Sequence, residues 1–386
     1  MIIKEVRASK IKDSRNEDSI EIFVKSDIGK ARASAPTGKS KGKFEKEYYK
    51  GNLNQVIKKI NSFKKLEGIE IKKFDDLKKV EKIFNFGSNP NVALEYAILK
   101  NFKKPFKKFN FGYRKFPIPL GNSIGGGLHT KSRKKADFQE FLIYVENCRK
   151  FSDRVKVNLL VYTEIKKYLT LNDKSFKGKR NDEGAWISGF SNIEILELLK
   201  KVCDRVSSRT KYSVRIGMDV AASSFYKNGK YVYNNYSATK RKCVLTRAEQ
   251  IEFLEHIVKK YNIGYLEDPL DETDFEGFKK LKKRTNGCMV VGDDLTVTRL
   301  KRVRKAKGGI DAVIVKPNQI GSLIEVKNVV EFCKLNKIKT IFSHRSGETK
   351  EDFLADLCYM FGGDFLKAGI YGKERIVKYN RLKKIR

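Results

Sequence analysis

The last two thirds of the chain repeat one pattern, in which a short apolar run ends at a charged or metal-competent residue. From Glu267 to Lys367 these polar residues lie 26, 23, 28 and 23 positions apart, which suits one strand and one helix per unit. The runs are SVRIGM before Asp219, IGYL before Glu267, CMVVG before Asp293, AVIV before Lys316, KTIFS before His344 and DFL before Lys367. This alternation predicts a parallel β/α barrel.

The first part of the chain has a different pattern. Polar and apolar residues alternate in 1–11 and 19–27, which predicts antiparallel strands, and 31–43 is rich in Pro, Gly, Ser and Lys, which is typical of a mobile loop. Helical spacing follows in 52–66 and 90–102. We therefore predict an α/β chain with a smaller N-terminal α+β domain, residues 1–116, and a C-terminal β/α barrel domain, residues 117–386.

The polar residues at the ends of the apolar runs indicate a single site, because the carboxyl ends of barrel strands meet at one rim. Taken alone, an Asp or Glu there often caps the following helix, and a Lys is usually solvated. Asp219, Glu267 and Asp293 offer three hard oxygen ligands of the kind that Mg²⁺ prefers. Lys316, one strand further on, would lie near that positive charge, which predicts a lowered amine pKa and a role as a base.

The next two strand ends supply groups that bind anions. His344, Arg345 and Ser346 follow one run and Lys367 ends the last, and arginine binds phosphate bidentately. A metal, a basic amine and an anion clamp together indicate abstraction of a proton next to a carboxylate, with the metal stabilising the enolate. Elimination also needs an acid. Glu183, in a loop, and Glu140, at the start of a strand, are candidates for a carboxyl pair that shares a proton, although the residues themselves give only a weak signal.

Composition and charge change this picture little. The chain has 386 residues, 83 Lys+Arg and 46 Asp+Glu, so the net charge is 83 − 46 = +37. No apolar run approaches the roughly 20 residues that span a bilayer, and the first residues lack a signal core, so we expect a cytoplasmic protein with no membrane contact. The six cysteines are scattered without a C-x-x-C pair, which favours reduced, mostly buried thiols.

The basic excess raises a second possibility. Residues 100–116 interleave basic and aromatic side chains, as single-strand binders do. However, the charge is spread over the chain, +17 in residues 1–140 and +20 in 141–386, and a solvated lysine-rich surface is the simpler interpretation. Nucleic acid is thus a possible partner but not a required one.

Several segments together resemble the enolase family of hydro-lyases. They are IGMDVAASSFY (216–226), YLEDPLDETDFEGF (265–278), VVGDDLTVT (290–298), VKPNQIGSL (315–323) and SHRSGET (343–349). At the amino end, 13–22 and 29–42 look like the family's opening strands and mobile loop. The resemblance implies conversion of 2-phosphoglycerate to phosphoenolpyruvate and water, with two Mg²⁺ ions of which the second arrives with substrate, and a homodimer. A Lys or His base acting with Mg²⁺ is the known chemistry of this superfamily, so the resemblance implies that mechanism as well.

The resemblance also implies a role for each matching residue. Asp219, Glu267 and Asp293 match the ligands of the tighter Mg²⁺, and Ser40 matches a ligand of the second ion. Lys316 matches the base, Glu183 the acid, Glu140 its supporting carboxylate, and His129 a histidine on a loop that closes over substrate. Substrate binding is implied for Arg345 and Ser346 at the phosphate, for Lys367 at the carboxylate, and for Gln139 and His344 as further contacts.

Two loops depart from the family pattern. Ala185 follows Gly184 where a second glycine is typical, and alanine lacks glycine's access to positive φ, so a stiffer loop is expected. Lys39 and Lys41 flank Ser40 where small residues are usual. Two alternatives stay open: a superfamily dehydratase acting on an unphosphorylated acid, and an enolase scaffold with a nucleic-acid-binding role.

Overall fold

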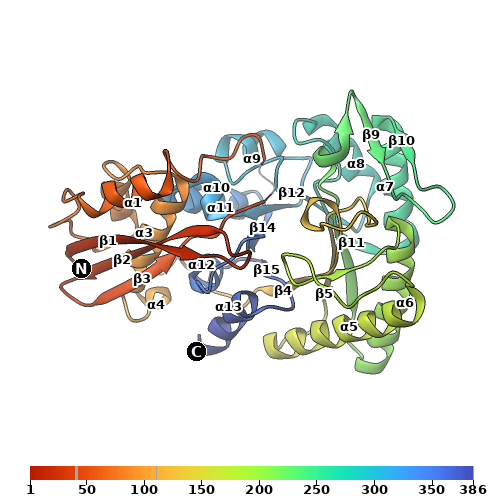
Figure 1. Cartoon of the computed structure of the whole chain (residues 1–386), viewed down its shortest axis with the longest axis horizontal. Helices are drawn as coiled ribbons and strands as arrows, with labels where there is room; N and C mark the ends of the chain where they lie inside the picture. Colours follow the sequence, from red (N-terminus) through yellow and green to blue (C-terminus); the bar gives the residue numbers. More distant parts are fainter. Residues whose placement is uncertain (40–41, 110, 386) are drawn as a thin grey trace.

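The computed structural model describes residues 1–39, 42–109 and 111–385, and shows a small sheet domain beside a closed barrel (Figure 1). The small domain has an antiparallel sheet of β1 (Ile3–Lys12), β2 (Asp18–Ser26) and β3 (Lys30–Ser34), in that order. Because successive side chains of a strand point to opposite faces of the sheet, the alternate residues Ile20, Ile22 and Val24 of β2 are buried on one face. The strands expected near the amino end are therefore present.

Four helices cover this sheet and join it to the barrel. They are α1 (Leu53–Asn61), α2 (Leu77–Glu81), α3 (Ser88–Lys100) and α4 (Pro105–Lys108). α3 is apolar on nearly all sides because it lies between β2 and β3 on one side and α10 on the other. One hydrophobic cluster runs from this domain into barrel residues such as Phe353 and Tyr379. The division at residue 116 stays a prediction.

The second part of the chain forms an eight-stranded barrel, which closes where β15 pairs with β4. Its strands are β4 (Ile118–Gly125), β5 (Glu140–Val145), β7 (Val214–Asp219), β11 (Ile263–Glu267), β12 (Met289–Gly292), β13 (Ala312–Val315), β14 (Lys339–Ser343) and β15 (Phe365–Lys367). β6 (Trp186–Ile187) adds to the end of β4, and β8 (Tyr226–Lys227), β9 (Lys230–Tyr233) and β10 (Cys243–Leu245) form a separate small sheet. The predicted barrel is confirmed.

One strand runs against the predicted direction. β5 is antiparallel to both neighbours, β4 and β7. The segment between β4 and β5 holds only a short 3-10 turn, Gly127–His129, and a parallel connection would need a crossover helix. As a result, β5 brings its first residue, Glu140, to the rim where the parallel strands end.

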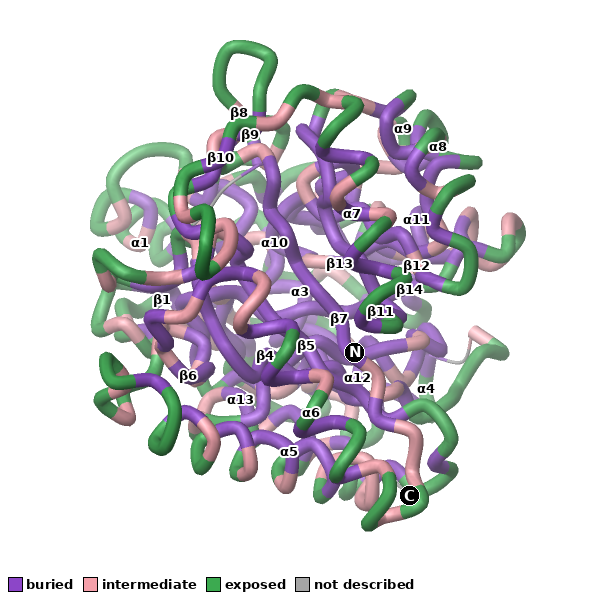
Figure 2. Tube along the Cα trace, turned by 90° about the vertical axis from the view of Figure 1, so that its right-hand side faces the viewer, coloured by how far each residue is buried: buried purple, intermediate pink, exposed green. Residues whose placement is uncertain are grey.

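Helices surround the barrel and leave its strands buried, as Figure 2 shows. They are α5 (Phe151–Asn172), α6 (Asn192–Thr210), α7 (Arg247–Tyr261), α8 (Phe275–Arg284), α9 (Leu300–Ala306), α10 (Pro317–Ile320), α11 (Leu323–Leu335), α12 (Phe353–Met360) and α13 (Lys373–Lys384). Leu142, Tyr265, Ile314 and Ile341 are among the side chains that fill the interior. Among the described residues, no helix is long and apolar enough to cross a membrane.

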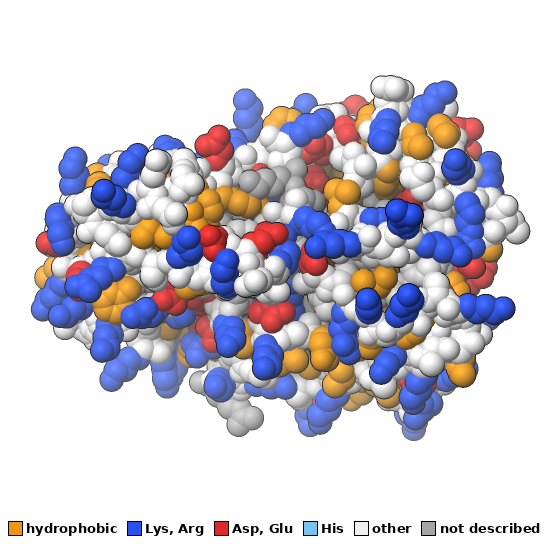
Figure 3. Space-filling model, in the orientation of Figure 1, with side chains coloured by type: hydrophobic (Ala, Val, Ile, Leu, Met, Phe, Trp, Pro, Cys, Tyr) orange, Lys and Arg blue, Asp and Glu red, His pale blue; other side chains and the backbone are white. Residues whose placement is uncertain are grey.

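The basic-aromatic stretch has both buried and exposed aromatic side chains, and Tyr113 and Phe116 are the exposed ones among its described residues. Phe106 and Phe109 are buried, and Phe102 and Phe111 pack against the same core. Phe111 stacks on Phe361 with ring centroids 4.5 Å apart. These buried aromatic side chains hold α4 and its flanking loops to the barrel, and a role of the stretch in nucleic-acid binding stays a prediction. Lys and Arg are spread over the visible face in Figure 3, and all six cysteines are buried and free.

A buried carboxyl group lies where the small domain meets the barrel. Glu95 of α3 is 1% exposed, and its Oε2 accepts the Leu323 amide at 2.7 Å at the start of α11. Burial, and then the charge of Glu81, raise the pKa of Glu95 well above its usual value. Glu81 in turn accepts the Ser322 hydroxyl at 2.7 Å.

Replacing Glu95 by Gln is expected to make stability less dependent on pH. A carboxyl group with a raised folded pKa contributes its full stability below the unfolded pKa and loses it as pH rises towards the folded one. Gln keeps the acceptor for Leu323 and cannot ionise. Between pH 5 and pH 8, the fall in unfolding free energy should be smaller in Glu95→Gln by about 1 kcal/mol or more, measured by urea denaturation. An equal fall in both proteins would contradict this.

Candidate active site

The predicted polar residues meet at one end of the barrel. Asp219, Glu267 and Lys367 are the last residues of β7, β11 and β15. In the strand register Asp219 lies opposite both Glu267 and Glu140. Asp293, Lys316 and His344 directly follow β12, β13 and β14. The repeat of apolar runs therefore correctly located these residues at one rim.

Lys367 lies at the centre of this rim. Its Nζ is 3.1 Å from Asp219 Oδ2, 2.7 and 2.9 Å from the two Glu267 oxygens, and 3.3 Å from Glu140 Oε1. The side chain is 2% exposed. Burial opposes its charge, but the surrounding carboxylates outweigh burial and raise the pKa of Lys367. Lys367 is thus the counter-ion of three acidic residues.

Lys316 has a single acidic partner, Asp293, whose Oδ2 its Nζ contacts directly. Asp293 Oδ1 accepts Gln319 Nε2 at 2.9 Å. The lowered pKa expected for Lys316 depends on the charge of a bound Mg²⁺ and stays a prediction. In the chain without metal, burial lowers that pKa, but the Asp293 charge outweighs burial and raises it. This effect arises because Asp293 pairs with Lys316 itself. The charges of Arg345 and Lys367 act in the opposite direction and lower the same pKa.

The three predicted Mg²⁺ ligands do not form a ready-made cage. Among the described residues, two sets of three potential metal-ligating side chains have ligand atoms within 4.8 Å of one another: His129 with Glu140 and Glu183, and Asp268 with Asp293 and Asp294. Asp219, Glu267 and Asp293 are not such a group as they stand. Asp219 and Glu267 turn to Lys367, and Asp293 turns to Lys316.

The Glu183 loop is a tight turn built on Asn181. Asn181 Oδ1 accepts the amides of Glu183 and Ala185, both at 3.0 Å. Gly184 has φ +81°, and a Cβ there would collide with the backbone of Tyr371. Ala185 is not among the residues with positive φ, so its methyl group fits this turn without strain. The departure at Ala185 thus leaves the loop conformation intact.

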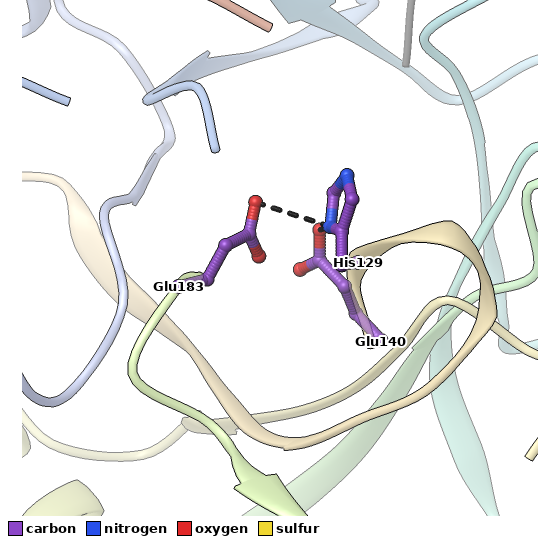
Figure 4. Close-up of side chains that lie close together, drawn as sticks. All are labelled: His129, Glu140 and Glu183. Carbon is purple, nitrogen blue, oxygen red and sulfur yellow. Dashed lines mark ion pairs between the residues drawn. The ribbon is translucent and has the colours of Figure 1, made fainter. Parts of the chain in front are cut away.

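Glu183 faces Glu140 and His129 across the rim, as Figure 4 shows. His129 Nδ1 is 3.3 Å from Glu183 Oε1 and 4.0 Å from Glu140 Oε1. Asn122 Nδ2 donates to Glu183 Oε2 at 2.9 Å. Burial, and then the charge of Glu183, raise the pKa of Glu140 well above its usual range.

The pKa of Glu183 moves the other way. Burial raises it, but positive charge nearby, with His129 and Arg375 among its sources, outweighs burial and lowers it well below its usual value. The pKa values of the two carboxyl groups are thus shifted in opposite directions, which suits a pair that shares one proton. Their role as the acid stays a prediction.

Arg345 is buried and held by the small domain. Its Nη1 and Nη2 donate to the two Glu45 carboxylate oxygens at 2.9 and 3.1 Å. Asn318 Oδ1 and Tyr48 Oη accept further bonds at 3.1 and 2.9 Å. This is the bidentate geometry expected for phosphate, with a carboxylate of the chain itself as the acceptor.

The remaining predicted residues line the same closed cavity or lie next to it. Gln139 Nε2 donates to Asp219 Oδ2 at 3.3 Å, and Ser346 Oγ accepts the Lys39 amide at 2.8 Å. Lys39 Nζ is 3.3 Å from Asp182 Oδ2. The cavity is lined by Gly38, His129, Gln139, Glu140, Glu183, Lys316, Ser343, His344, Arg345, Ser346 and Lys367. Ser40 and Lys41 lie outside the described residues.

Three charged residues at this rim were not singled out from the sequence. Glu45 pairs with Arg345, Asp268 accepts the amides of Asp293 and Asp294, and Arg375 contacts His344. Only Asp268 could have been found from the sequence, since it adjoins Glu267; the other two lie far from their partners along the chain.

A larger cavity of about 540 Å³ opens at the opposite end of the barrel and is lined by none of the predicted site residues.

Replacing Lys367 by Met should strongly destabilise the chain, because three buried carboxyl groups would lose the cation that they share. Breaking a buried ion pair from one side costs about 3–5 kcal/mol. Adding Glu267→Gln should recover part of that loss. Lys100→Met, which removes a more exposed partner of Glu351, is the control and should cost about 1 kcal/mol or less. Urea denaturation without added metal measures the free energy of unfolding of the parent and of the three variants. Equal losses of this free energy in Lys367→Met and Lys100→Met would contradict the role of Lys367.

Comparison with known proteins identifies the family. The model of the enolase C-terminal TIM barrel domain matches residues 114–386. The chain is 35% identical to the enolase of Methanosphaera stadtmanae and 35% identical to that of Methanothermobacter thermautotrophicus, in each case over 100% of this chain and 96% of the relative. It is 34% identical to the enolase of Thermoplasma acidophilum, over 99% of this chain and 98% of that protein. The chain therefore belongs to the enolase family of lyases.

Proposed function

We propose that the protein is a Mg²⁺-dependent hydro-lyase that converts 2-phosphoglycerate to phosphoenolpyruvate and water. The observation that carries this proposal is the meeting of Lys316, the Glu183–Glu140 pair and Arg345 around one closed cavity at the barrel rim. A base, a proton-sharing acid pair and an anion-binding guanidinium are the three groups that this elimination needs. Membership of the enolase family supports 2-phosphoglycerate as the substrate.

The residues fit a bound Mg²⁺. Asp219, Glu267 and Asp293 belong to three adjacent strands and offer only hard oxygen atoms. Burial, and then the charges of Asp219 and Asp293, raise the pKa of Glu267 to about 8, and a cation bound beside it would favour its ionised form. We propose these three residues as the ligands of the tighter ion. The second ion, and Ser40 as its ligand, stay predictions.

Lys316 is the proposed base. In its neutral form, its Nζ would take the C2 proton of the substrate, and its place beside the cavity lets it reach a bound acid. Bound Mg²⁺ would supply positive charge that stabilises the enolate and lowers the pKa of Lys316. Arg345 and Lys367 already lower that pKa from the protein side.

The Glu183–Glu140 pair is the proposed acid. It holds one shareable proton, and that proton would pass to the C3 hydroxyl as the C–O bond breaks, so that water leaves. Asn122 and His129 orient Glu183 towards the cavity. Removal of the C2 proton and departure of the protonated hydroxyl together give phosphoenolpyruvate and water.

The remaining roles concern substrate binding. Arg345 and Ser346 are proposed to hold the phosphate, and Lys367 the carboxylate, with Gln139 and His344 as further contacts. Binding of phosphate to the Arg345 fork requires displacement of the Glu45 carboxylate, which has the same bidentate geometry. A bidentate guanidinium site for a phosphate dianion argues against the alternative of a dehydratase that acts on an unphosphorylated acid, because such a substrate has no phosphate to bind there. The homodimer and the cytoplasmic location stay predictions.

Purified protein with 2-phosphoglycerate and Mg²⁺ should produce the ultraviolet absorbance of the enol product, and a chelator should abolish it. Lys316→Ala and Glu183→Gln should each lower kcat by about 100-fold or more, since each removes a proton-transfer group. Lys334→Ala and Glu194→Gln, which change a partly buried lysine and glutamate away from the cavity, should stay within about twofold of the parent. Turnover of unphosphorylated acids with none on 2-phosphoglycerate would overturn the proposal.

Mg²⁺ alone should raise the melting temperature, because a ligand that binds only the folded state stabilises it. Glu267→Gln should lose most of this increase, since it replaces a charged oxygen ligand by an amide. Asp356→Asn is the matched control: Asp356 is equally buried and pairs with Arg381, away from the rim. It should lower the melting temperature yet keep the Mg²⁺-dependent increase. An unchanged increase in Glu267→Gln would refute the ligand assignment without testing turnover.

A further inference from the structure

The C-terminal helix α13 sends two buried cations towards the rim. Arg375 is fully buried and Lys378 is 1% exposed, which is unusual for these residue types. Lys378 Nζ donates to Glu348 Oε2 at 2.6 Å, and Glu348 Oε1 accepts the Arg345 amide at 3.1 Å. The helix therefore supports the loop that follows β14 through charged contacts as well as apolar packing.

Arg375 joins two loops of the site. Its Nη1 contacts His344 Nδ1 and the Arg345 carbonyl oxygen, both at 2.6 Å. Its Nη2 donates to the carbonyl oxygens of Asp182 and Ser346 at 2.9 and 2.8 Å. All four terminal N–H groups of the guanidinium are thereby used. Nη2 thus joins the residue before Glu183 to the proposed phosphate-binding loop, and Nη1 holds the same loop through the Arg345 carbonyl oxygen.

The contact with His344 determines which ring nitrogen carries the proton. A guanidinium has only donors, so His344 Nδ1 must accept from Arg375 and must itself lack a hydrogen. The proton of the neutral ring is then on Nε2. His344 Nε2 is 3.9 Å from Glu183 Oε1 and points into the cavity that both side chains line.

The surroundings of His344 keep the ring neutral. The charged groups that face it are Arg375 and Lys378 from α13, Lys367 from β15, and Glu183 from the acid loop. Burial, and then the charge of Arg375, lower the pKa of His344 well below its usual value, while Glu183 acts in the opposite direction.

We propose that Arg375 is a positioning residue that fixes His344 as the Nε2–H tautomer and locks the Glu183 loop to the phosphate-binding loop. A donor at Nε2 then faces Glu183 and the substrate hydroxyl group that Glu183 serves. A second tautomer would present an unprotonated nitrogen there and remove that donor. The tautomer and the loop contacts stand on this structure alone, whereas the effect on turnover rests on the proposed function.

The chain has three histidines, so the tautomer is measurable by ¹⁵N NMR of imidazole-labelled protein, with His344→Gln to assign the signal. The parent should show His344 as a single neutral Nε2–H form from pH 6 to 8. In Arg375→Met the signal should become a mixture of tautomers, and the ring should titrate at higher pH. Arg381→Met is the matched control, because Arg381 lies on the same helix and pairs with Asp356. It should leave the His344 signal unchanged.

Kinetics gives a second readout on the same variants. Arg375→Met should lower kcat by about tenfold or more and move the acid limb of the kcat/KM profile up by about one pH unit, because the ring protonates more readily. Arg381→Met should change neither. If Arg375→Met does not fold, Arg375→Lys replaces it in the same measurement. Because one ammonium group cannot reach both His344 and the Asp182 carbonyl oxygen, kcat should still fall in this variant. A folded Arg375 variant that keeps a pure Nε2–H ring and the parental acid limb would overturn the proposal.

Discussion

The structure depends on the balance of charges that the closed barrel forces together at one rim. Strand closure places Glu140, Asp219 and Glu267 side by side in register, out of water. Carboxylates in such a place are costly unless cations and hydrogen bonds compensate them. Lys367 provides that compensation for all three at once. The position of the other charged groups follows from the same requirement.

Elements outside the parallel part of the barrel complete this balance. The antiparallel β5 brings Glu140 to the rim, and the small domain brings Glu45 to Arg345. α13 brings Arg375 to His344 and to the carbonyl oxygens of both neighbouring loops. Each of these contacts joins residues that are far apart in the sequence. The site is therefore an assembly of the whole chain, although most of the predicted residues come from the barrel strands.

The barrel and the rim residues were predictable because strand and helix periods are local properties of the sequence. The direction of β5 was not, since it depends on the absence of a crossover helix in a loop whose composition says little. The partners of Lys316 and Arg345 were not predictable either, because pairing across a rim depends on side-chain geometry. For that reason the sequence did not reveal that Asp293, predicted as a metal ligand, pairs with Lys316 directly and raises its pKa in the chain without metal.

These pairings also bear on how the proposed ligands would bind. Arg345, proposed to hold a phosphate, already holds the Glu45 carboxylate, and Asp219 and Glu267, proposed to hold a cation, already hold the Lys367 ammonium group. Each proposed binding group thus has an internal partner with the same sign of charge as its ligand. Binding would then exchange one buried counter-ion for another, so that little additional charge has to leave water. A neutral ligand could not take part in such an exchange, because it would leave Glu45 or Lys367 displaced and the opposite charge unpaired.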